Sequence, residues 1–362
     1  MKISTLITLA VSLTIAVGCK PATPLPAPVA VAGPQDAAGL AEAFESVGGK
    51  VKRDASGNII ELDLRGAKLG EQPLASLGGT VALESLLVSG PDIKDADLEI
   101  LSSLSLKVLD ARDCAITNAG MKSIGTQKEL RALRLSGKSG ACTVDDDGLK
   151  EISQLTQLKA LSLDYLWVSE VGLTTLAALT SLEELNLAKT LVGNEALAVM
   201  GQFPRLKKLR ISQCQIDDMG LVDLVKVSTL EDLDLSENSQ ISNAGMESIG
   251  KLTSLKKLNL WRDALTDDGV RQLAGLTNLE WLNLDNTQLS DAGLDSLQGM
   301  HKLTFLHLGS TSISDAGLPK LTGLTALKDL KVTRTAVSQA GVDELKKSLT
   351  STAIQLEYIV SE

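Results

Sequence analysis

The chain has 362 residues, of which only 2% are aromatic, and it carries a formal net charge of −10. Its length would allow two ordinary domains, but a globular core would use more aromatic residues than this. An acidic chain without a run of Lys and Arg has few charges to neutralise phosphates, so the composition argues against a nucleic-acid partner.

The first 19 residues, MKISTLITLAVSLTIAVGC, have the form of a secretory signal peptide. One Lys precedes an apolar run, Ile3 to Val17, that is too short to span a membrane comfortably. The segment Ala16-Val17-Gly18-Cys19 resembles the lipobox of bacterial lipoproteins. The resemblance implies that residues 1–18 are removed and that Cys19 is lipidated. The alternative is an ordinary secretory signal that is cleaved nearby.

The residues after Cys19 indicate where the chain is held. In the bacterial sorting rule that this segment resembles, Asp at position 20 retains a lipoprotein in the inner membrane. Lys20 gives no such signal, which implies the outer membrane of a bacterial cell envelope. Residues 19–35 are rich in Pro and favour extended polyproline-like conformations. We expect this linker to hold the folded part away from the membrane.

Residues 36–58 are predicted to form an N-terminal cap. Apolar residues at a spacing of three predict a helix from Gln35 to Val47, and two glycines end it. A hairpin of Lys50–Arg53 and Ile59–Leu64 follows across a turn that contains Gly. A repeat protein has to cover its first apolar layer, which this helix and hairpin would do.

From Ile59 onwards the sequence repeats one unit, which begins Leu-x-x-Leu-x-Leu, and most copies start 24 residues after the previous one. The leucines alternate as in a strand, whereas the later apolar residues recur at helical spacing. A decayed copy at Ser351 is expected to close the C-terminal end of the 59–362 region. The full copies start at Ile59, Leu83, Leu106, Leu130, Leu158, Leu182, Leu206, Leu230, Leu255, Leu279, Leu303 and Leu327.

The helical part of the unit usually starts with Ser, Thr or Asp two or three residues before a Gly, as in Ser314-Asp315-Ala316-Gly317. Such side chains accept hydrogen bonds from the free N–H groups of a helix start, and Asp favours the positive end of the helix dipole. We expect the Gly to let the turn fold tightly onto the previous coil.

The unit resembles the leucine-rich repeat family over about 300 of the 362 residues, since period, strand and helix face agree in a dozen copies. The residues after the strand resemble the Cys-containing, ribonuclease-inhibitor-like subtype. The resemblance implies an α/β fold, namely a right-handed leucine-rich-repeat solenoid (horseshoe) of about 12 repeats with a concave parallel sheet and convex helices. Helices need lateral spacings of about 8–10 Å and strands only about 4.8 Å, so the stack must curve with the sheet inside.

The segments that could carry chemistry have simpler structural explanations. Cys114, Cys142 and Cys214 occupy a repeat position that is often Thr elsewhere, which favours buried structural thiols. A disulfide between Cys114 and Cys142, on neighbouring coils, stays open. The acidic run 145–147 starts a helix, where acids are favoured, and lacks calcium-loop spacing. No nucleophile and base can be paired from the sequence, so we expect no enzyme activity, no cofactor and no metal site.

The concave face is the better place to look for function. We expect the third, fifth, seventh and eighth positions of each unit to be exposed there, and three consecutive units place aromatic rings at these positions. Exposed aromatic residues with a polar rim mark binding surfaces, although the rings could merely pack on their neighbours. At an ordinary pKa, a histidine among them would make binding depend on pH near 6–7. The candidate binding residues are Trp261, Trp281, Phe305, His307, Lys257, Arg262 and Asp285.

We therefore predict a non-enzymatic, lipid-anchored protein of the cell envelope that binds a protein or a glycan on its concave face. Its partners would be that ligand and, through the lipid on Cys19, a membrane. The first alternative is a passive structural scaffold of the envelope, which would need only bland polar residues on the inner face. The second alternative is an enzyme.

Overall fold

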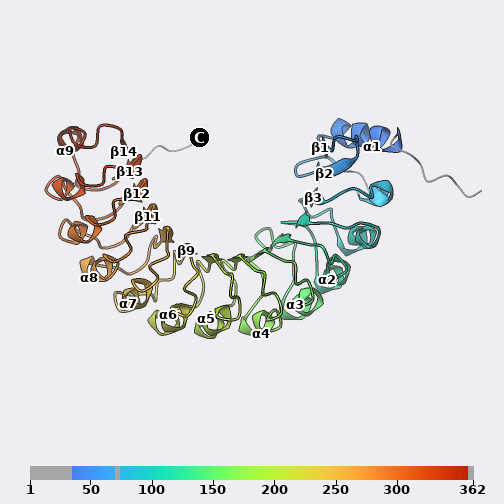
Figure 1. Cartoon of the computed structure of the whole chain (residues 1–362), viewed down its shortest axis with the longest axis horizontal. Helices are drawn as coiled ribbons and strands as arrows, with labels where there is room; N and C mark the ends of the chain where they lie inside the picture. Colours follow the sequence, from blue (N-terminus) through green and yellow to red (C-terminus); the bar gives the residue numbers. More distant parts are fainter. Residues whose placement is uncertain (1–34, 70–73, 358–362) are drawn as a thin grey trace, which may run out of the picture.

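The computed structural model describes residues 35–69 and 74–357, which form an open arc (Figure 1). The strands line the inner side of the arc and the helices the outer side. The predicted signal peptide, Cys19 and the linker up to residue 34 lie outside the described residues. Within the described ranges, no helix is long and apolar enough to cross a membrane.

The described strands form one 14-stranded sheet whose order follows the chain. The first two strands are antiparallel, and every later strand pairs in parallel with the one before it. The predicted solenoid with a concave parallel sheet is therefore confirmed. The strands are β1 (Lys50–Arg53), β2 (Ile59–Asp63), β3 (Ser85–Leu87), β4 (Val108–Asp110), β5 (Ala132–Ser136), β6 (Ala160–Asp164), β7 (Glu184–Asn186), β8 (Lys208–Arg210), β9 (Asp232–Asp234), β10 (Lys257–Asn259), β11 (Trp281–Asn283), β12 (Phe305–His307), β13 (Asp329–Lys331) and β14 (Ala353–Gln355).

The convex segments are short, and four of those described are 3₁₀ helices rather than α-helices. A coil of 24 residues leaves few residues for its outer side, and a 3₁₀ helix spans about 2.0 Å per residue against about 1.5 Å for an α-helix. The helix α1 (Gln35–Ser46) lies at the N-terminal end, and the convex elements are η1 (Ala75–Gly79), η2 (Asp95–Ser103), α2 (Asn118–Gly125), α3 (Asp146–Ile152), α4 (Glu170–Thr174), α5 (Asn194–Met200), α6 (Asp218–Leu224), α7 (Met246–Ile249), α8 (Asp267–Arg271), η3 (Gly293–Leu297), η4 (Leu318–Leu321) and α9 (Gln339–Leu345).

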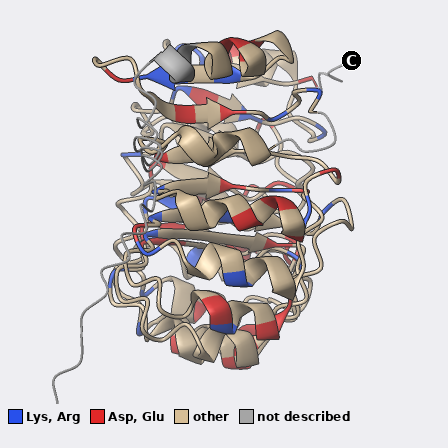
Figure 2. Ribbon diagram, turned by 90° about the vertical axis from the view of Figure 1, so that its right-hand side faces the viewer, with Lys and Arg blue, Asp and Glu red and all other residues tan. Residues whose placement is uncertain are grey.

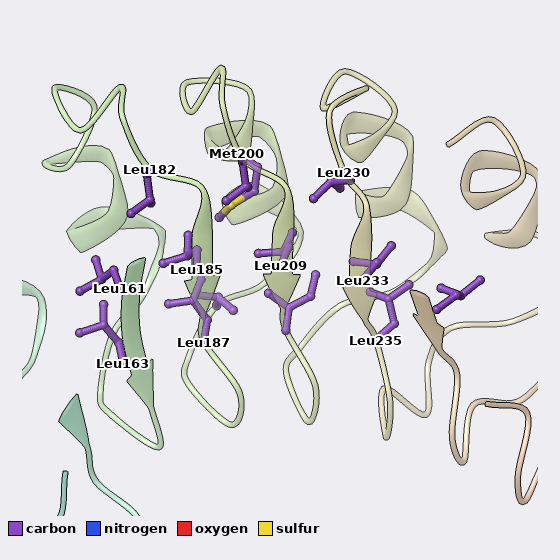
Figure 3. Packing of buried hydrophobic residues seen from close by; sticks show 14 of the residues in the cluster. Leu161, Leu163, Leu182, Leu185, Leu187, Met200, Leu209, Leu230, Leu233 and Leu235 are labelled. Carbon is purple, nitrogen blue, oxygen red and sulfur yellow. The ribbon is translucent and has the colours of Figure 1, made fainter. Parts of the chain in front are cut away.

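The core is a stack of leucine layers, one from each coil. Leu258, Leu282 and Leu306 are paired in register on neighbouring strands, and all three are fully buried. Figure 3 shows the equivalent leucines of other repeats, such as Leu185 and Leu209, pointing into the coil interior. Burying one leucine side chain stabilises the folded state by about 1.5–3 kcal/mol. The leucine layer of a coil is shielded from water only when a neighbouring coil packs against it. Each repeat therefore depends on the next.

The N-terminal end of the stack is covered by α1 together with the antiparallel pair of β1 and β2. Ala41 and Phe44 of α1 are buried in the core, whereas Val47 is 36% exposed. Apolar spacing places Val47 on the same face as the other two, but α1 ends at Ser46 and the chain turns away. At the opposite end, β14 completes the sheet by pairing with β13.

Polar side chains at the helix starts join many neighbouring coils. The Asp291 carboxylate accepts hydrogen bonds from the backbone N–H of Ser314 at 2.7 Å and from its hydroxyl at 2.6 Å. The Ser314 hydroxyl in turn accepts from the N–H of Ala316 at 3.3 Å. A Cβ on Gly317 would stand 2.3 Å from Asp291 Oδ1, so this close contact between coils requires glycine.

We call these junctions the cap ladder, and their members are chemically matched. Where the capping residue is Asp, the side chain from the previous coil is Asn, which donates through its amide, for example from Asn118 to Asp145 at 2.7 Å. Asp145 also caps α3 by accepting from the N–H of Asp147, so the acidic run is a helix start as predicted. The ladder joins Asp95 to Thr117, Asn118 to Asp145, Asp146 to Ser169, Asn194 to Asp217, Asp218 to Ser242, Asn243 to Thr266, Asp267 to Ser290, Asp291 to Ser314 and Asp315 to Ser338.

The strands on the inner face are shorter than the repeat pattern predicts. From β7 to β13 they cover only the third to fifth positions of the unit. The residue at the eighth position has a left-handed backbone conformation, which turns the chain sharply into the coil. Examples are Arg262 with φ 61° and Ser310 with φ 50°. For a residue other than Gly this conformation costs about 1–2 kcal/mol. Trp261, Arg262 and Asp285 therefore lie in turns along one edge of the sheet and not on the strands.

Candidate binding surface

The stacked rings of Trp281 and Phe305 form the centre of the candidate site. The two residues are paired directly on β11 and β12, their ring centroids are 4.9 Å apart, and their planes differ by 5°. Lys257 Nζ of β10 lies 5.3 Å from the Trp281 centroid, and Lys331 Nζ of β13 lies 5.6 Å from the Phe305 centroid. We call these four residues the aromatic row.

The order of the strands decides which parts of the rings are open. Each ring has the other ring on one face and a lysine on the other face, because β10 and β13 flank the pair. Stacking and cation–π contacts use ring faces, whose electrons attract the ammonium groups. Since both rings are half-buried, their edges are the parts presented to the concave space.

His307 extends the row towards the edge of the sheet. Its ring is nearly perpendicular to that of Phe305, with centroids 6.4 Å apart, and its Nε2 lies 3.9 Å from Asp285 Oδ1. Burial lowers the pKa of His307, Asp285 raises it in part, and the charge of Lys331 lowers it again. The pKa of His307 is thus lower than the ordinary value on which the predicted pH dependence near 6–7 relies.

The remaining predicted residues form a separate pair. The Arg262 guanidinium lies 5.4 Å from the Trp261 ring centroid and 3.2 Å from Glu237 Oε2. In the described part of the chain, no ring contact joins Trp261 to the stacked rings. The structure thus brings five of the seven predicted residues together and leaves Trp261 and Arg262 at the neighbouring turn.

The other charges on the concave face are largely balanced. Arg210 lies 3.3 Å from Asp164 and 3.4 Å from Asp234, and Lys257 lies 3.4 Å from Asp232. Figure 2 likewise shows acidic and basic residues interspersed along the strands and helices. Acidic and basic side chains therefore neutralise one another across the middle of the sheet.

A small hollow opens beside His307, and the sequence analysis did not find it. We call this hollow the socket, and it measures about 90 Å³. It lies beside Gly309, which occupies a seventh position, where the neighbouring units carry Asp285 and Thr333. A glycine in a column of side chains is the sequence signal that could have revealed it. The socket is lined by Asp285, His307, Ser310, Lys331, Thr333, Arg334 and Gln355.

The cysteines in the repeats lie away from the site. Cys114 and Cys142 are buried and free, and Cys214 is free and partly buried. Burial raises the pKa of Cys114 to about 12, so its thiol stays protonated and unreactive at neutral pH. The Cys214 thiol donates to the Leu187 carbonyl at 3.2 Å, which matches a structural role. Among residues 35–69 and 74–357, no three His, Cys, Asp or Glu side chains are grouped as metal ligands would be.

A few large apolar side chains are exposed outside the concave sheet. Trp167, in the turn after β6, is 69% exposed, and Leu191, in the equivalent turn of the next repeat, is 46% exposed. Val171 of α4 and Met219 of α6 are also exposed, on the convex side. These residues are distant in the repeat from the aromatic row, so they provide controls for tests of the site.

Comparison with known proteins agrees with the architecture. A leucine-rich repeat family profile matches residues 253–313, and a second one matches residues 102–125 and 228–250. No curated protein matches the chain.

Two solved structures resemble the solenoid. An internalin from Listeria monocytogenes is 17% identical with a TM-score of 0.57, over 91% of this chain and 96% of that chain. A complex of TLR13 with a single-stranded RNA is 21% identical with a TM-score of 0.51, over 81% of this chain but only 42% of that chain. At these identities the likeness concerns the fold. The chain therefore contains leucine-rich repeats and folds as a leucine-rich-repeat solenoid.

Proposed function

We propose that this protein is a non-enzymatic binding protein whose partner docks on the concave face around the aromatic row. The observation that carries the proposal is the stacked pair of Trp281 and Phe305, flanked by Lys257 and Lys331 on the concave face of the sheet. Repeat solenoids use such extended concave surfaces for binding, and aromatic anchors dominate interface energies.

The geometry of the rings favours a protein over a glycan. A sugar ring packs its C–H groups against an open aromatic face, but the faces of Trp281 and Phe305 are already occupied. Ring edges flanked by ammonium groups instead suit apolar and acidic side chains. The partner that we propose is therefore a protein segment.

The cellular setting is part of the same proposal. The N-terminal sequence supports a bacterial envelope lipoprotein anchored through Cys19 in the outer membrane, with the repeats held away from the bilayer by the Pro-rich linker. The residues after each strand support the Cys-containing, ribonuclease-inhibitor-like subtype of the repeat. A passive scaffold is the competing function, and the following experiment separates the two.

Replacing Trp281 and Phe305 together by Ala is expected to abolish capture of the partner from envelope extracts. The solenoid should still fold, because neither ring belongs to a leucine layer. Loss of the stacking and cation–π contacts should lower stability by about 1–3 kcal/mol. Affinity capture with the purified chain, combined with melting curves, measures both quantities.

Two aromatic residues outside the row provide matched controls. Tyr165→Ala removes a concave ring that contacts Lys189, and Trp167→Ala removes an exposed indole from a turn. Both variants should capture as much partner as the unchanged protein. Equal capture by the double variant would favour the scaffold, and an unfolded double variant would show that the rings are structural.

Cys19→Ala is expected to release the protein from membranes. A lipobox cysteine carries the acyl chains that would hold the protein at the membrane. Detergent partitioning and fatty-acid labelling measure the change, with Cys214→Ala as the control for a thiol inside the repeats. Unchanged labelling of the Cys19 variant would exclude the lipobox interpretation and leave the ordinary secretory signal.

A further inference from the structure

We propose that the side of the arc formed by the turns after β6 and β7 is a homodimer interface, on which two copies of the chain meet across a two-fold axis. This surface is distinct from the aromatic row and does not depend on it. We call it the lateral patch, and its members are Lys138, Trp167, Glu170, Lys189, Leu191 and Glu195.

Exposed apolar side chains are concentrated on this part of the arc. Among the described residues, seven large apolar side chains are exposed, and five of them belong to the three consecutive repeats of residues 158–229. Trp167 and Leu191 occupy the same position in neighbouring coils, and the Leu191 N–H donates to the Val168 carbonyl at 2.9 Å, so the two side chains lie next to each other. The Trp167 ring contacts no other ring or cation in the described part of the chain. An exposed apolar cluster with a charged border is typical of an interaction surface.

The lysines of the patch lie on the concave side of this apolar pair. Lys189 follows β7 in the turn, where its Nζ lies 5.5 Å from the Tyr165 ring centroid. Lys138 belongs to the four-residue insertion, which lies beside the same turn because the Gly137 N–H donates to the Asp164 carbonyl at 3.0 Å. Both lysines are exposed, and neither makes an ion pair with a described residue. The basic border of the patch is therefore open to a partner.

The carboxylates of the patch lie on its convex side. Glu170 and Glu195 belong to the first turns of α4 and α5. Neither carboxylate has a hydrogen bond or an ion pair with a described residue. The patch thus has a basic border, an apolar centre and an acidic border, in that order from the concave to the convex side.

The cap ladder shows why the Glu170 carboxylate has no partner within the chain. From Asp95 to Ser338, a stretch that the structure describes throughout, the ladder is interrupted once, between α4 and α5. Glu170 occupies the position at which the other coils carry Asp or Asn, but the cap of the next helix is Gly193, which has no side chain to donate. Because the ladder bond is missing here, the carboxylate remains available to a partner outside the chain.

A second copy of the chain is the occupant that this order of charges favours. A two-fold axis between Trp167 and Leu191 reverses both the concave-to-convex direction and the order of the coils. Trp167 of one copy then meets Leu191 of the other, and Lys189 stands opposite Glu170. The remaining lysine and glutamate of the patch are related in the same way, so every free charge of the patch finds an opposite charge.

Other occupants match the patch less well. A bilayer with anionic headgroups would repel the two free carboxylates and a chain whose net charge is −10. A partner with charges of a single sign would leave one border of the patch unpaired. A surface that carries both signs in the reverse order pairs with both borders, and a second copy supplies it.

Sedimentation equilibrium of the purified full chain, in a detergent whose density the buffer matches, measures self-association. The unchanged protein should form a reversible dimer. Trp167→Ala should weaken the dimer at least about tenfold, because central aromatic residues carry much of the energy of an interface. The fold should remain intact, since Trp167 is 69% exposed. Val81→Ala, which removes an exposed apolar side chain near the N-terminal end of the arc, should leave the dimer unchanged.

Charge reversal tests the two-fold arrangement itself. Lys189→Glu should weaken the dimer, because it places two carboxylates opposite each other, and Glu170→Lys should weaken it to a similar degree. A chain with both reversals should recover most of the affinity, because each pair is restored with its charges exchanged. Lys302→Glu is the control and should have no effect, since Lys302 contacts Asn278 in the turn before β12, outside the patch.

Three results would overturn the proposal. The first is a chain that stays monomeric at every concentration reached, and the second is a dimer that Trp167→Ala and Lys189→Glu leave unchanged. The third is a doubly reversed chain that dimerises no better than either single variant, which would exclude the two-fold arrangement. Quenching of the Trp167 fluorescence of a monomeric chain by brominated lipid would assign the patch to a membrane instead.

Discussion

Leu282→Asp is expected to destabilise the protein by about 4 kcal/mol or more, because an unpaired carboxylate cannot be accommodated in an apolar layer. Leu282 is fully buried and lies in register between Leu258 and Leu306, so the charge would face three coils at once. The loss should spread to neighbouring repeats, since each coil covers the layer of the next. Denaturation followed by circular dichroism, together with hydrogen exchange by repeat, measures the size and extent of the effect.

A matched control places the same charge on the surface of the same repeat. Gln288 is exposed in the turn after β11, and Gln288→Asp should change the denaturation midpoint only slightly. A melting curve of Leu282→Asp that coincides with that of the control would show that the strand register is wrong.

Asp263→Asn is expected to stabilise the protein, increasingly so as the pH rises from 4 to 8. Asp263 is 2% exposed, its Oδ1 accepts from the N–H of Asn238 at 3.0 Å, and its Oδ2 has no partner among the described residues. Burial raises the pKa of Asp263 to about 8, with the hydrogen bond from Asn238 lowering it in part and the carboxylates of Asp234 and Glu237 adding to the rise. The Arg262 guanidinium beside it is engaged by Glu237.

The hydrogen bonds of the other repeats explain why Asp263 is a poor fit when ionised. At the same position Thr287 donates its hydroxyl to the Leu284 carbonyl at 2.8 Å, and Asn238 donates its amide to the Leu235 carbonyl at 2.6 Å. The coil therefore presents a carbonyl that needs a donor. A carboxylate can only accept, so Asp263 suits this position only while it is protonated.

The sign of the pH effect follows from the two pKa values. In the unfolded chain an Asp loses its proton near pH 3.9, whereas in the folded protein Asp263 keeps it until about pH 8. Between these values the folded state binds more protons, so stability falls as the pH rises. At about 1.4 kcal/mol for each pKa unit, Asp263→Asn should gain up to roughly 4 kcal/mol at pH 7 and almost nothing at pH 4.

Denaturation midpoints at pH 4, 6 and 8 test this prediction. Asp268→Asn, an exposed carboxylate of α8 in the same repeat, is the control and should show no comparable trend. A gain that is the same at every pH would show that Asp263 is ionised in the folded protein, and a loss would show that its carboxylate has a partner.

The regular features of the fold could be predicted from the sequence because they repeat. The alternation at Leu279, Leu282 and Leu284 recurs often enough to define the strand, its register and the buried layer. The glycines of the helix starts were predicted to allow close packing, and Gly317 against Asp291 shows the contact. The period cannot show how far each strand extends, because the left-handed turn at the eighth position depends on the path of the backbone. The predictions for residues 1–34 stay predictions.

The repeat positions of the residues in the candidate site could be predicted from the sequence, but the contacts between their side chains could not. A shared repeat position places Trp281 beside Phe305, but only the coordinates show the rings face to face between two lysines. Gly309 and Asp263 were missed for one reason. Each is an uncommon residue for its repeat position, and its effect depends largely on side chains of the neighbouring coils.

The cap ladder also constrains how such a chain can have grown by copying its own repeats. From Asp267 to Ser338, the Asp at the helix start of each coil accepts a hydrogen bond from a Ser of the next coil. A 24-residue copy inserted in this stretch would therefore form the same hydrogen bonds with both of its neighbours. A coil capped by Asp145 or Asp217 can follow only a coil that offers Asn, since two carboxylates would otherwise meet at hydrogen-bond distance. A coil capped by Asp145 or Asp217 would therefore have to be duplicated together with the coil before it. The C-terminal third is thus the part of the chain where single-repeat duplication is chemically neutral, and that part carries the aromatic row.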